Sequence, residues 1–513
     1  MTEWTAGYVG DIEYMPGFYR EQGPAHLDLA CVIGGVQPPD RLGGLGYCEL
    51  GCGQGLTVLI LAAANPDGHF VGIDFNPAHI ARGRALAAAA GLTNVELIEA
   101  SFASLLEPGG PDLPPFDYVT LHGVYSWISA GNRQAIVRFL TDHVRPGGLV
   151  YVSYNAMPGW MMGLPLQRLI YEFAGAFPAR SDRMVEGALA FVGAMQKAGA
   201  RAIPGAEMVE RLEREAGGRK ISYLAHEYLN AHWQPLYHAD VARDLADAKL
   251  TYVASASLLE NYPELTLSAA QRDLISGLPD ETVRETLKDY FVARTFRRDV
   301  FVRGARRLAG DARERLLARL PLAPLLAPGR TTLDVTVPIG EAKLEERLYR
   351  PAFEALAERD VTPAQILDLP AVRGHTGGTA LELVGMLAGT GQAVPAPSRG
   401  AAPAPARRFN QAVVAQALEQ GLIDAALAAP VAASGLRIGL FEMLAYGALV
   451  AGAPTEAGPL AEAAWRMLEA RGDKLRKDGQ PIESREENLD VLRREFATVL
   501  AESVPIWRRL GAL

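Results

Sequence analysis

The stretch Glu49-Leu50-Gly51-Cys52-Gly53-Gln54-Gly55 lies between an apolar run, Leu45–Leu50, and an alanine- and leucine-rich run, Leu56–Ala64. Glycine has no Cβ, so a turn with three glycines can adopt positive φ and approach a ligand closely. The first amides of the following helix have no partner within that helix and can face a bound group. The pattern therefore predicts a strand, a ligand-binding turn and a helix in succession.

An acidic residue in register with this turn makes the pattern more specific. Asp74 closes the next apolar run, Phe70–Ile73, nineteen positions after Gly55. A carboxylate there can accept both hydrogen bonds of a ribose diol. A dinucleotide-binding turn needs G-x-G-x-x-G, whereas here Leu56 stands where the third glycine belongs. Glu49 would also repel a pyrophosphate, and it suits an amino-acid ammonium better. The alternative is a glycine-rich turn that binds nothing.

Strands and helices alternate through the first third of the chain, which predicts a doubly wound parallel α/β sheet. Further strands are expected at Val95–Glu99, Asp117–Leu121 and Leu149–Tyr154, with helices at Ala78–Ala90 and Arg133–His143. A mostly helical stretch follows, with helices expected at Leu164–Ala174, Arg183–Ala198 and Glu207–Glu215. Two late strands are then expected, and they would complete the first sheet and make the helices before them an insertion. These are Leu250–Ala254 and Arg298–Arg303.

The pattern E-x-G-x-G-x-G with an aspartate at the second strand resembles the class I S-adenosylmethionine-dependent methyltransferases. That resemblance implies S-adenosyl-L-methionine as cofactor and a Rossmann-like methyltransferase sheet. It also implies the cofactor-binding residues, with the adenine near the end of the third strand. These residues are Glu49, Gly51, Gly53, Gly55, Asp74, Phe75, Ser101, Phe102 and His122.

Two aromatic segments follow the fourth and fifth expected strands, His122–Trp127 (HGVYSW) and Ser153–Trp160 (SYNAMPGW). The carboxyl ends of strands are where open α/β sheets bind ligands. Aromatic side chains with polar tips suit a cavity that holds a sulfonium and presents an amine or hydroxyl to it. The alternative is that these aromatics pack an inserted helical cap. The candidates for the catalytic pocket are Tyr14, His122, Tyr125, Trp127, Tyr154 and Asn155.

Taken together, the two aromatic segments resemble those of bacterial methyltransferases that carry a methyltransferase regulatory domain. The likeness extends to Tyr14–Pro16, to His226–Asn230 (HEYLN) and to Asp289–Gly304. The C-terminal part, with Gly472–Ile482, is similar to the accessory domain of bacterial protein-lysine methyltransferases. The resemblance implies methyl transfer to an amine, a lysine, of a protein or peptide substrate.

A lysine acceptor must first lose a proton, because only the neutral amine has a free lone pair. Its reference pKa is about 10.4, and an apolar aromatic pocket would lower that pKa by desolvation. His122 is a candidate proton acceptor, and a structural histidine is the alternative. Two other functions stay open: a small-molecule (metabolite) methyltransferase, and a non-enzymatic regulator that contacts DNA.

Four regions are expected. They are a cofactor-binding methyltransferase core at 1–160, a helical insertion and regulatory region with the late strands at 161–304, a connector with a winged-helix-like domain at 305–395, and a linker with a helical C-terminal domain at 396–513. Much of the chain thus lies beyond the sheet. That surplus favours a macromolecular acceptor or an assembly role such as a homodimer.

Composition narrows the classes of protein further. Of 513 residues, 49% are hydrophobic and 21% charged, and the net charge is −9, which disfavours nucleic acid as a partner. The three cysteines have no C-x-x-C spacing, and His226, His232 and His238 have no metal-ligand spacing, so no metal is expected. We expect a cytoplasmic protein without a membrane segment. An arginine cluster within 294–307 predicts a solvated face or inter-domain salt bridges, and an acidic or nucleic-acid partner is the alternative.

Overall fold

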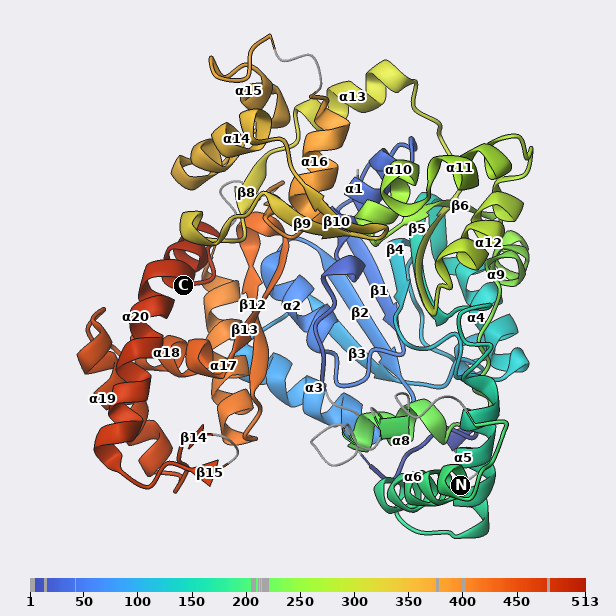
Figure 1. The fold of residues 1–513 in the computed structure, drawn as a ribbon, viewed down its shortest axis with the longest axis horizontal. Coiled ribbons are helices and arrows are strands. Elements are labelled where there is room, and N and C mark those ends of the chain that lie inside the picture. The colour runs from blue at the N-terminus through green and yellow to red at the C-terminus, as the bar shows by residue number, and fades with distance from the viewer. Residues whose placement is uncertain are drawn as a thin grey trace.

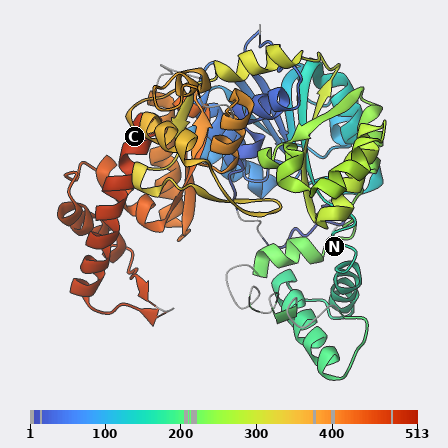
Figure 2. The same ribbon diagram turned by 45° about the horizontal axis from the view of Figure 1, so that its top comes forward.

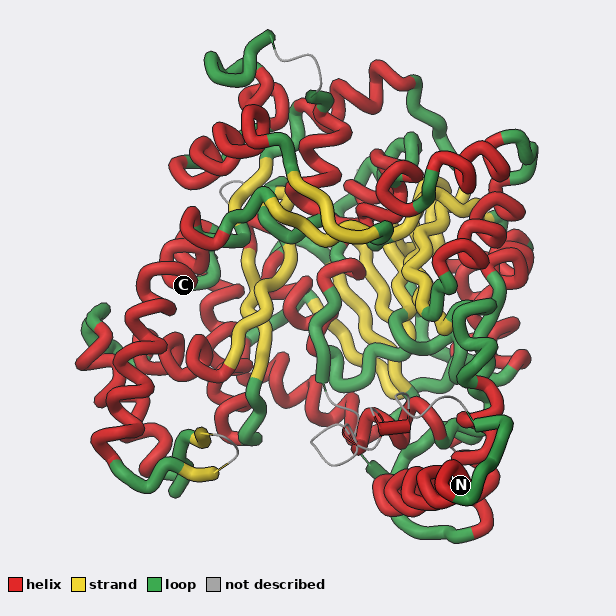
Figure 3. Tube along the Cα trace, in the orientation of Figure 1, coloured by secondary structure: helices red, strands yellow, loops and turns green. Residues whose placement is uncertain are grey.

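The protein is described by a computed structural model over residues 5–12, 16–41, 43–203, 209–210, 212, 214, 221–374, 378–397, 403–477 and 480–513. A twisted sheet lies at the centre, and helices pack around it (Figures 1 and 3). Of the C-terminal helices, α17 (Ala404–Glu419) packs against α2 (Leu56–Ala64) and α3 (Pro77–Ala90) (Figure 1). A group of helices from the middle of the chain projects away from the body (Figure 2). Within the described residues, no helix combines the length and apolar character needed to cross a bilayer.

The central sheet has seven strands in the order β3-β2-β1-β4-β5-β7-β6. The strands are β1 Gly46–Leu50, β2 His69–Asp74, β3 Val95–Glu99, β4 Phe116–Leu121, β5 Val144–Asn155, β6 Leu250–Ser255 and β7 Phe296–Arg303. The first five pair in parallel, so the predicted doubly wound sheet is confirmed, and the two late strands do complete it. The sheet is mostly parallel, and β7 pairs antiparallel with both β5 and β6. Antiparallel strands can be neighbours in a sheet without a crossover connection, and β7 is the next strand after β6 in the chain.

Each strand sends alternate side chains to opposite faces of the sheet, and the two faces have separate cores. On β5, Leu149 and Tyr151 join the core that also contains α1 (Pro24–Ile33) and α2 (Leu56–Ala64). Val150 and Val152 join the core on the other face. The apolar run in this strand is therefore continuous because both of its sides are buried.

Helices α3 and α4 (Ala130–His143), which flank the parallel strands, begin and end at residues suited to those positions. Helix α3 (Pro77–Ala90) starts after Asn76, whose side chain accepts hydrogen bonds from the amides of the first turn, and ends at Gly91 with φ 63°. Helix α4 (Ala130–His143) starts after Ser129, which caps it in the same way. The N-terminal ends of α3 and α4, which follow β2 and β4, therefore lie at the carboxyl edge of the sheet.

The insertion after β5 consists of helices with a core of their own. They are α5 Leu164–Ala176, α6 Ser181–Lys197 and α8 Ile221–Tyr228. A helix expected at Glu207–Glu215 lies mostly outside the described residues. The helices that flank β6 and β7 are α9 His238–Ala246, α10 Pro263–Thr266, α11 Ala269–Ser276 and α12 Glu281–Val292.

The next region combines short helices with two small antiparallel sheets, β9 with β10 and β8 with β11. Its elements are α13 Gly310–Ala318, β8 Leu322–Pro324, β9 Asp334–Val337, β10 Gly340–Lys343, α14 Glu346–Glu358, α15 Pro363–Leu367, α16 Ala380–Gly389 and β11 Ala393–Pro395. The winged-helix-like character of this region stays a prediction.

The C-terminal region is mostly helical, as expected, and it also contains a β-hairpin. Its elements are α17 Ala404–Glu419, β12 Asp424–Ala429, β13 Ser434–Gly439, α18 Leu440–Val450, α19 Ala457–Glu469, β14 Arg476–Lys477, β15 Gln480–Pro481 and α20 Arg485–Arg509. The sequence analysis missed the hairpin because the alanine-rich β12 has no β-branched side chain. This hairpin packs on α2, and the region shares one core with the first face of the sheet.

Candidate functional site

The glycine-rich turn after β1 has the backbone conformation that its glycines predict. Gly51, Gly53 and Gly55 have φ angles of 72°, 56° and 77°. The amides of Gly51 and Cys52 donate to the carbonyl oxygen of Ile73, over 2.7 and 3.0 Å. A Cβ on Gly51 would lie 2.5 Å from Val124 Cγ2, whereas a Cβ on Gly53 would meet no heavy atom within 4 Å. The turn is therefore packed against Val124 at Gly51, whereas at Gly53 there is open space beside the backbone.

Asp74 ends β2 against this turn. Its Oδ2 accepts from the Gly53 amide and its Oδ1 from the Asn76 amide, each over 2.9 Å. The side chain is buried, at 7% exposure, and it lines a cavity. Each carboxylate oxygen has a second lone pair, so the pair of oxygens can also accept from a vicinal diol.

Glu49 lies at the end of β1 and is buried at 5% exposure. Its Oε2 has no hydrogen-bond partner among the described residues. Burial raises the pKa of Glu49 to about 8. A buried carboxylate oxygen without a partner is costly when the acid is ionised, so Oε2 suits a cationic group of a ligand.

His122 follows β4 and faces the same cavity. Its Nδ1 lies 2.8 Å from the Tyr151 hydroxyl and 3.3 Å from the Ser153 hydroxyl, and Tyr19 stacks on its ring at 3.7 Å between centroids. Burial lowers the pKa of His122 to about 3. The imidazole is therefore neutral at physiological pH and adds no positive charge to the cavity.

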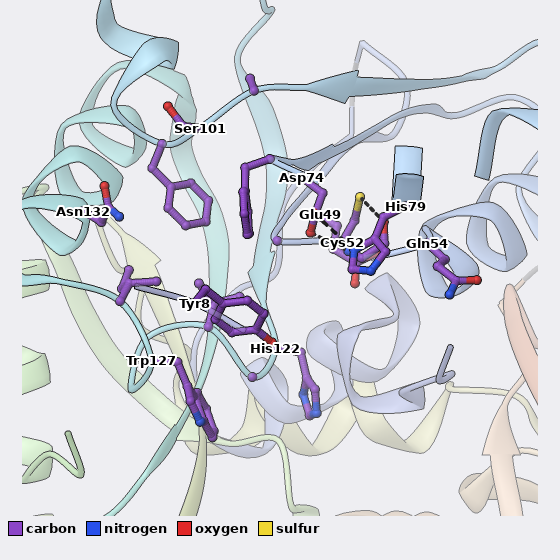
Figure 4. A pocket seen from close by; sticks show the side chains of 18 of the residues that line it. Tyr8, Glu49, Cys52, Gln54, Asp74, His79, Ser101, His122, Trp127 and Asn132 are labelled. Atoms are coloured by element: carbon purple, nitrogen blue, oxygen red, sulfur yellow. Dashed lines mark hydrogen bonds and ion pairs between the residues drawn. The ribbon is translucent and has the colours of Figure 1, made fainter. Parts of the chain in front are cut away.

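These groups line one cavity at the carboxyl edge of the sheet, with an empty volume of about 1240 Å³ including its opening to solvent. Figure 4 shows Glu49, Asp74 and Cys52 on one side of Tyr8, with Ser101 and Asn132 on the other. His122 and Trp127 form a further part of the wall (Figure 4). The cavity thus combines a diol acceptor, a buried carboxyl for a cation and an uncharged aromatic wall.

The structure brings together nearly all of the predicted cofactor-binding residues. The ones that line the cavity are Glu49, Gly51, Gly53, Asp74, Phe75, Ser101, Phe102 and His122. Gly55 is not among its lining residues. It precedes α2 in the left-handed conformation, where a Cβ would lie 3.3 Å from Leu97 Cδ2. Its position supports a structural role in the turn.

The predicted catalytic residues lie in different places. His122 and Trp127 line the cavity, and Tyr14 lies outside the described residues. Tyr125 and Tyr154 are fully buried in the core on the other face of the sheet and do not line the cavity. Strand alternation explains Tyr154: Tyr151 and Ser153 face His122, so Tyr154 faces the opposite side.

Tyr154 belongs instead to a buried ionic network between β7 and the helices around it. Its hydroxyl donates to Asp299 Oδ2 over 2.6 Å, and His238 Nδ1 lies 2.9 Å from the same oxygen. Arg297 pairs with Asp299, Asp289 and Glu285. The arginine cluster is thus used partly inside the protein. In the described part of the chain, no group of three or more His, Cys, Asp and Glu side chains lies together in a metal-binding arrangement.

Asn155 is also behind the wall rather than on it. Its amide nitrogen Nδ2 donates to Glu227 Oε1 over 3.1 Å, and its backbone N–H donates to the Ser126 hydroxyl over 2.8 Å. Burial raises the pKa of Glu227 to about 7. Asn155 therefore links the strand that ends beside the cavity to α8 of the insertion.

In the N-terminal segment, sequence reasoning proposed Tyr14 for the pocket and missed the residues that line the cavity. Thr5, Ala6, Tyr8, Gly17 and Tyr19 line the cavity, although all of them precede the first strand. Burial raises the pKa of Tyr8, and Asp74 adds to the effect. The only local signal was the density of aromatic and glycine residues in the first 20 positions.

Comparison with known proteins is consistent with this geometry. Residues 48–150 match a family model described as a methyltransferase domain, and residues 220–303 match one described as a predicted methyltransferase regulatory domain. The uncharacterized protein sll1526 of Synechocystis is 33% identical over 99% of this chain and 99% of its own length. A demethylmenaquinone methyltransferase of Listeria monocytogenes is 24% identical over 36% of this chain and 73% of its own length.

Solved structures show the same fold over nearly the whole chain. PKMT2 from Rickettsia typhi superposes with a TM-score of 0.67, and its complex with AdoHcy with a TM-score of 0.69. In both cases the sequence identity is 17%, and the match covers 98% of this chain and 99% of the other. The regions beyond the central sheet are therefore shared as well.

Proposed function

This chain belongs to the family of S-adenosylmethionine-dependent methyltransferases that carry a methyltransferase regulatory domain, and we propose that it methylates an amine, a lysine side chain of a protein or peptide. The residues of the cavity fit the cofactor. Asp74 suits the ribose diol, the unpartnered Glu49 Oε2 suits the ammonium, and the open space beside Gly53 leaves room for close approach.

The observation that carries this proposal is the uncharged aromatic wall next to the cofactor-binding residues. Tyr8, Tyr19, His122 and Trp127 form it, and His122 is neutral because its pKa is about 3. An amine that enters a cavity with such a wall is desolvated. Desolvation lowers the pKa of the amine and favours its neutral, nucleophilic form. The same aromatic faces attract the cationic groups that approach them.

S-adenosylmethionine, when bound, supplies an activated methyl group on its sulfonium. The contribution of the chain is alignment and exclusion of water. Asp74 and Glu49 would hold two separate groups of the cofactor and so would set its orientation. His122 is fixed through Nδ1 by Tyr151 and Ser153, and its low pKa makes it a weak base. We therefore propose that His122 shapes the cavity wall and does not act as the proton acceptor.

The extent of the likeness to PKMT2 supports a protein acceptor. PKMT2 is a protein-lysine methyltransferase. The fold that it shares with this chain includes the regions beyond the central sheet, which cofactor binding does not require. The similarity to demethylmenaquinone methyltransferase, which covers 36% of this chain, supports a second candidate, an apolar small-molecule acceptor.

Transfer of radioactive methyl from S-adenosylmethionine tests both candidates. The full chain is incubated with a bacterial lysate, which is then separated into protein and small-molecule fractions. We expect label in protein, recovered as methyllysine after acid hydrolysis, and no label with Asp74→Ala. Label only in the small-molecule fraction would contradict the lysine proposal and favour the metabolite.

A further inference from the structure

The segment Pro16–Tyr19 forms a wall of the cofactor cavity without being a helix or a strand. Backbone groups outside helices and strands often find their hydrogen-bond partners on side chains, and three groups of this segment do so. The Tyr19 amide donates to the Thr57 hydroxyl over 3.3 Å, and that hydroxyl donates to the Gly17 carbonyl over 3.2 Å. Thr57 belongs to α2, so one anchor of the segment lies within the catalytic region.

The second anchor comes from the C-terminal region. Arg437, on β13, donates from Nε and Nη2 to the Phe18 carbonyl oxygen over 3.1 and 2.5 Å. Its guanidinium carbon lies 5.9 Å from the centre of the Tyr19 ring. Two residues before it, Gly435 lies so close to Phe18 that a Cβ there would be 2.8 Å from Cζ. The hairpin therefore packs directly on the wall segment.

The wall segment in turn covers His122. Tyr19 stacks on the imidazole at 3.7 Å with 28° between the ring planes, and both rings line the cofactor cavity. On its other side the segment borders a second cavity, which Arg437 and side chains of α17 also line. A displacement of the segment would thus open the cofactor cavity toward the C-terminal region.

We propose that Arg437 is a positioning residue of the cofactor site. By holding the Phe18 carbonyl and the Tyr19 ring, it keeps Tyr19 stacked on His122, so a residue of the C-terminal region completes the cavity. A guanidinium suits this task because its planar fork can direct two charge-assisted N–H groups at one carbonyl oxygen. The proposal concerns cofactor binding and is independent of the acceptor.

Calorimetric titration of the full chain with S-adenosylhomocysteine tests it. Arg437→Met removes both donors and the charge, and we expect the affinity to fall about tenfold, equivalent to about one charge-assisted hydrogen bond. Arg437→Lys keeps the charge and one donor and should restore part of the affinity. The control is Arg466→Met, an exposed arginine on α19 in the same region, with affinity within about twofold of the parent.

A double-mutant cycle separates positioning from a general loss of folding. In a Tyr19→Leu background, Arg437→Met should change the affinity by no more than about twofold, because its effect acts through Tyr19. Independent, multiplicative losses would overturn the proposal, and so would an unchanged affinity in Arg437→Met. If Arg437→Met fails to fold, the cycle is run with Arg437→Lys. Failure of the lysine proposal would leave these affinities unaffected.

Discussion

The backbone N–H of Gly53 donates a 2.9 Å hydrogen bond to Oδ2 of Asp74, so the carboxylate that ends β2 is part of the turn that follows β1. The other oxygen of Asp74 accepts from the Asn76 amide, also over 2.9 Å. The same carboxylate therefore shapes the glycine turn and faces the cavity with its remaining lone pairs.

Replacement of Asp74 should separate these two roles. Asp74→Ala loses both acceptor oxygens, so we expect the affinity for S-adenosylhomocysteine to fall at least about a hundredfold, as for two charge-assisted hydrogen bonds. Asp74→Asn keeps one acceptor and should lose less. Glu96→Ala, which removes an exposed carboxylate on the neighbouring β3, is the control. Unchanged affinity of Asp74→Ala by calorimetry would remove the ribose assignment.

Two glycines of the turn should respond differently to alanine. Both Gly51→Ala and Gly53→Ala pay about 1–2 kcal/mol for positive φ. Gly51→Ala also forces Cβ against Val124, at 2.5 Å, so its thermal unfolding midpoint should be lower than that of Gly53→Ala. Gly53→Ala should instead mainly weaken cofactor binding, because its Cβ would project into open space. Equal unfolding midpoints for the two variants would contradict this reading.

Glu49 should make the cofactor-free protein less stable as the pH rises. Its pKa in the folded protein is about 8, above its ordinary value of 4.5, so the fold favours the protonated form. The stability that this preference adds is fully present below pH 4.5 and is lost as the pH rises toward 8. Glu49→Gln cannot ionise, so its melting temperature should exceed that of the parent by an amount that grows from pH 5 to pH 8. A constant difference would argue against a buried, unpaired carboxyl.

Cofactor binding should release a proton from the same residue. At pH 7 a carboxyl with a pKa of about 8 is mostly protonated, and a bound ammonium would stabilise its ionised form. Calorimetry at pH 7 in two buffers of different ionisation enthalpy should detect release of up to about one proton per S-adenosylhomocysteine. Glu49→Gln should bind more weakly and release none. Equal proton release by parent and variant would assign the proton to another group.

Tyr154 and Trp127 should have opposite effects when altered. Tyr154→Phe removes one of the buried donors to Asp299, the hydroxyl at 2.6 Å, so it should cost about 1–3 kcal/mol of stability and leave the cofactor affinity unchanged. Trp127→Leu removes part of the cavity wall and should weaken binding or turnover with a smaller effect on stability. Thermal unfolding and calorimetry on both variants check this. If Tyr154→Phe lowered the cofactor affinity without lowering the stability, Tyr154 would contribute to the cofactor pocket after all.

The sequence alone was sufficient for the part of the site that is local in the chain. The turn from Glu49 to Gly55 takes its shape from glycines at adjacent positions, and β1 and β2 are neighbours, so Asp74 could be assigned to the turn in advance. The strands and helices of the catalytic region were predictable because each carries its own apolar pattern and its own capping residues.

Only the tertiary structure decided which aromatic side chains form the cavity. Tyr154 was a reasonable candidate until the direction of Tyr151 and Ser153 toward His122 placed it on the opposite face of β5. Tyr19 and Arg437 carried no local signal, because their contacts join positions far apart in the chain. Local patterns record the backbone conformation of a segment, whereas a wall built from the N-terminal segment, β4 and β13 depends on how these elements pack against one another.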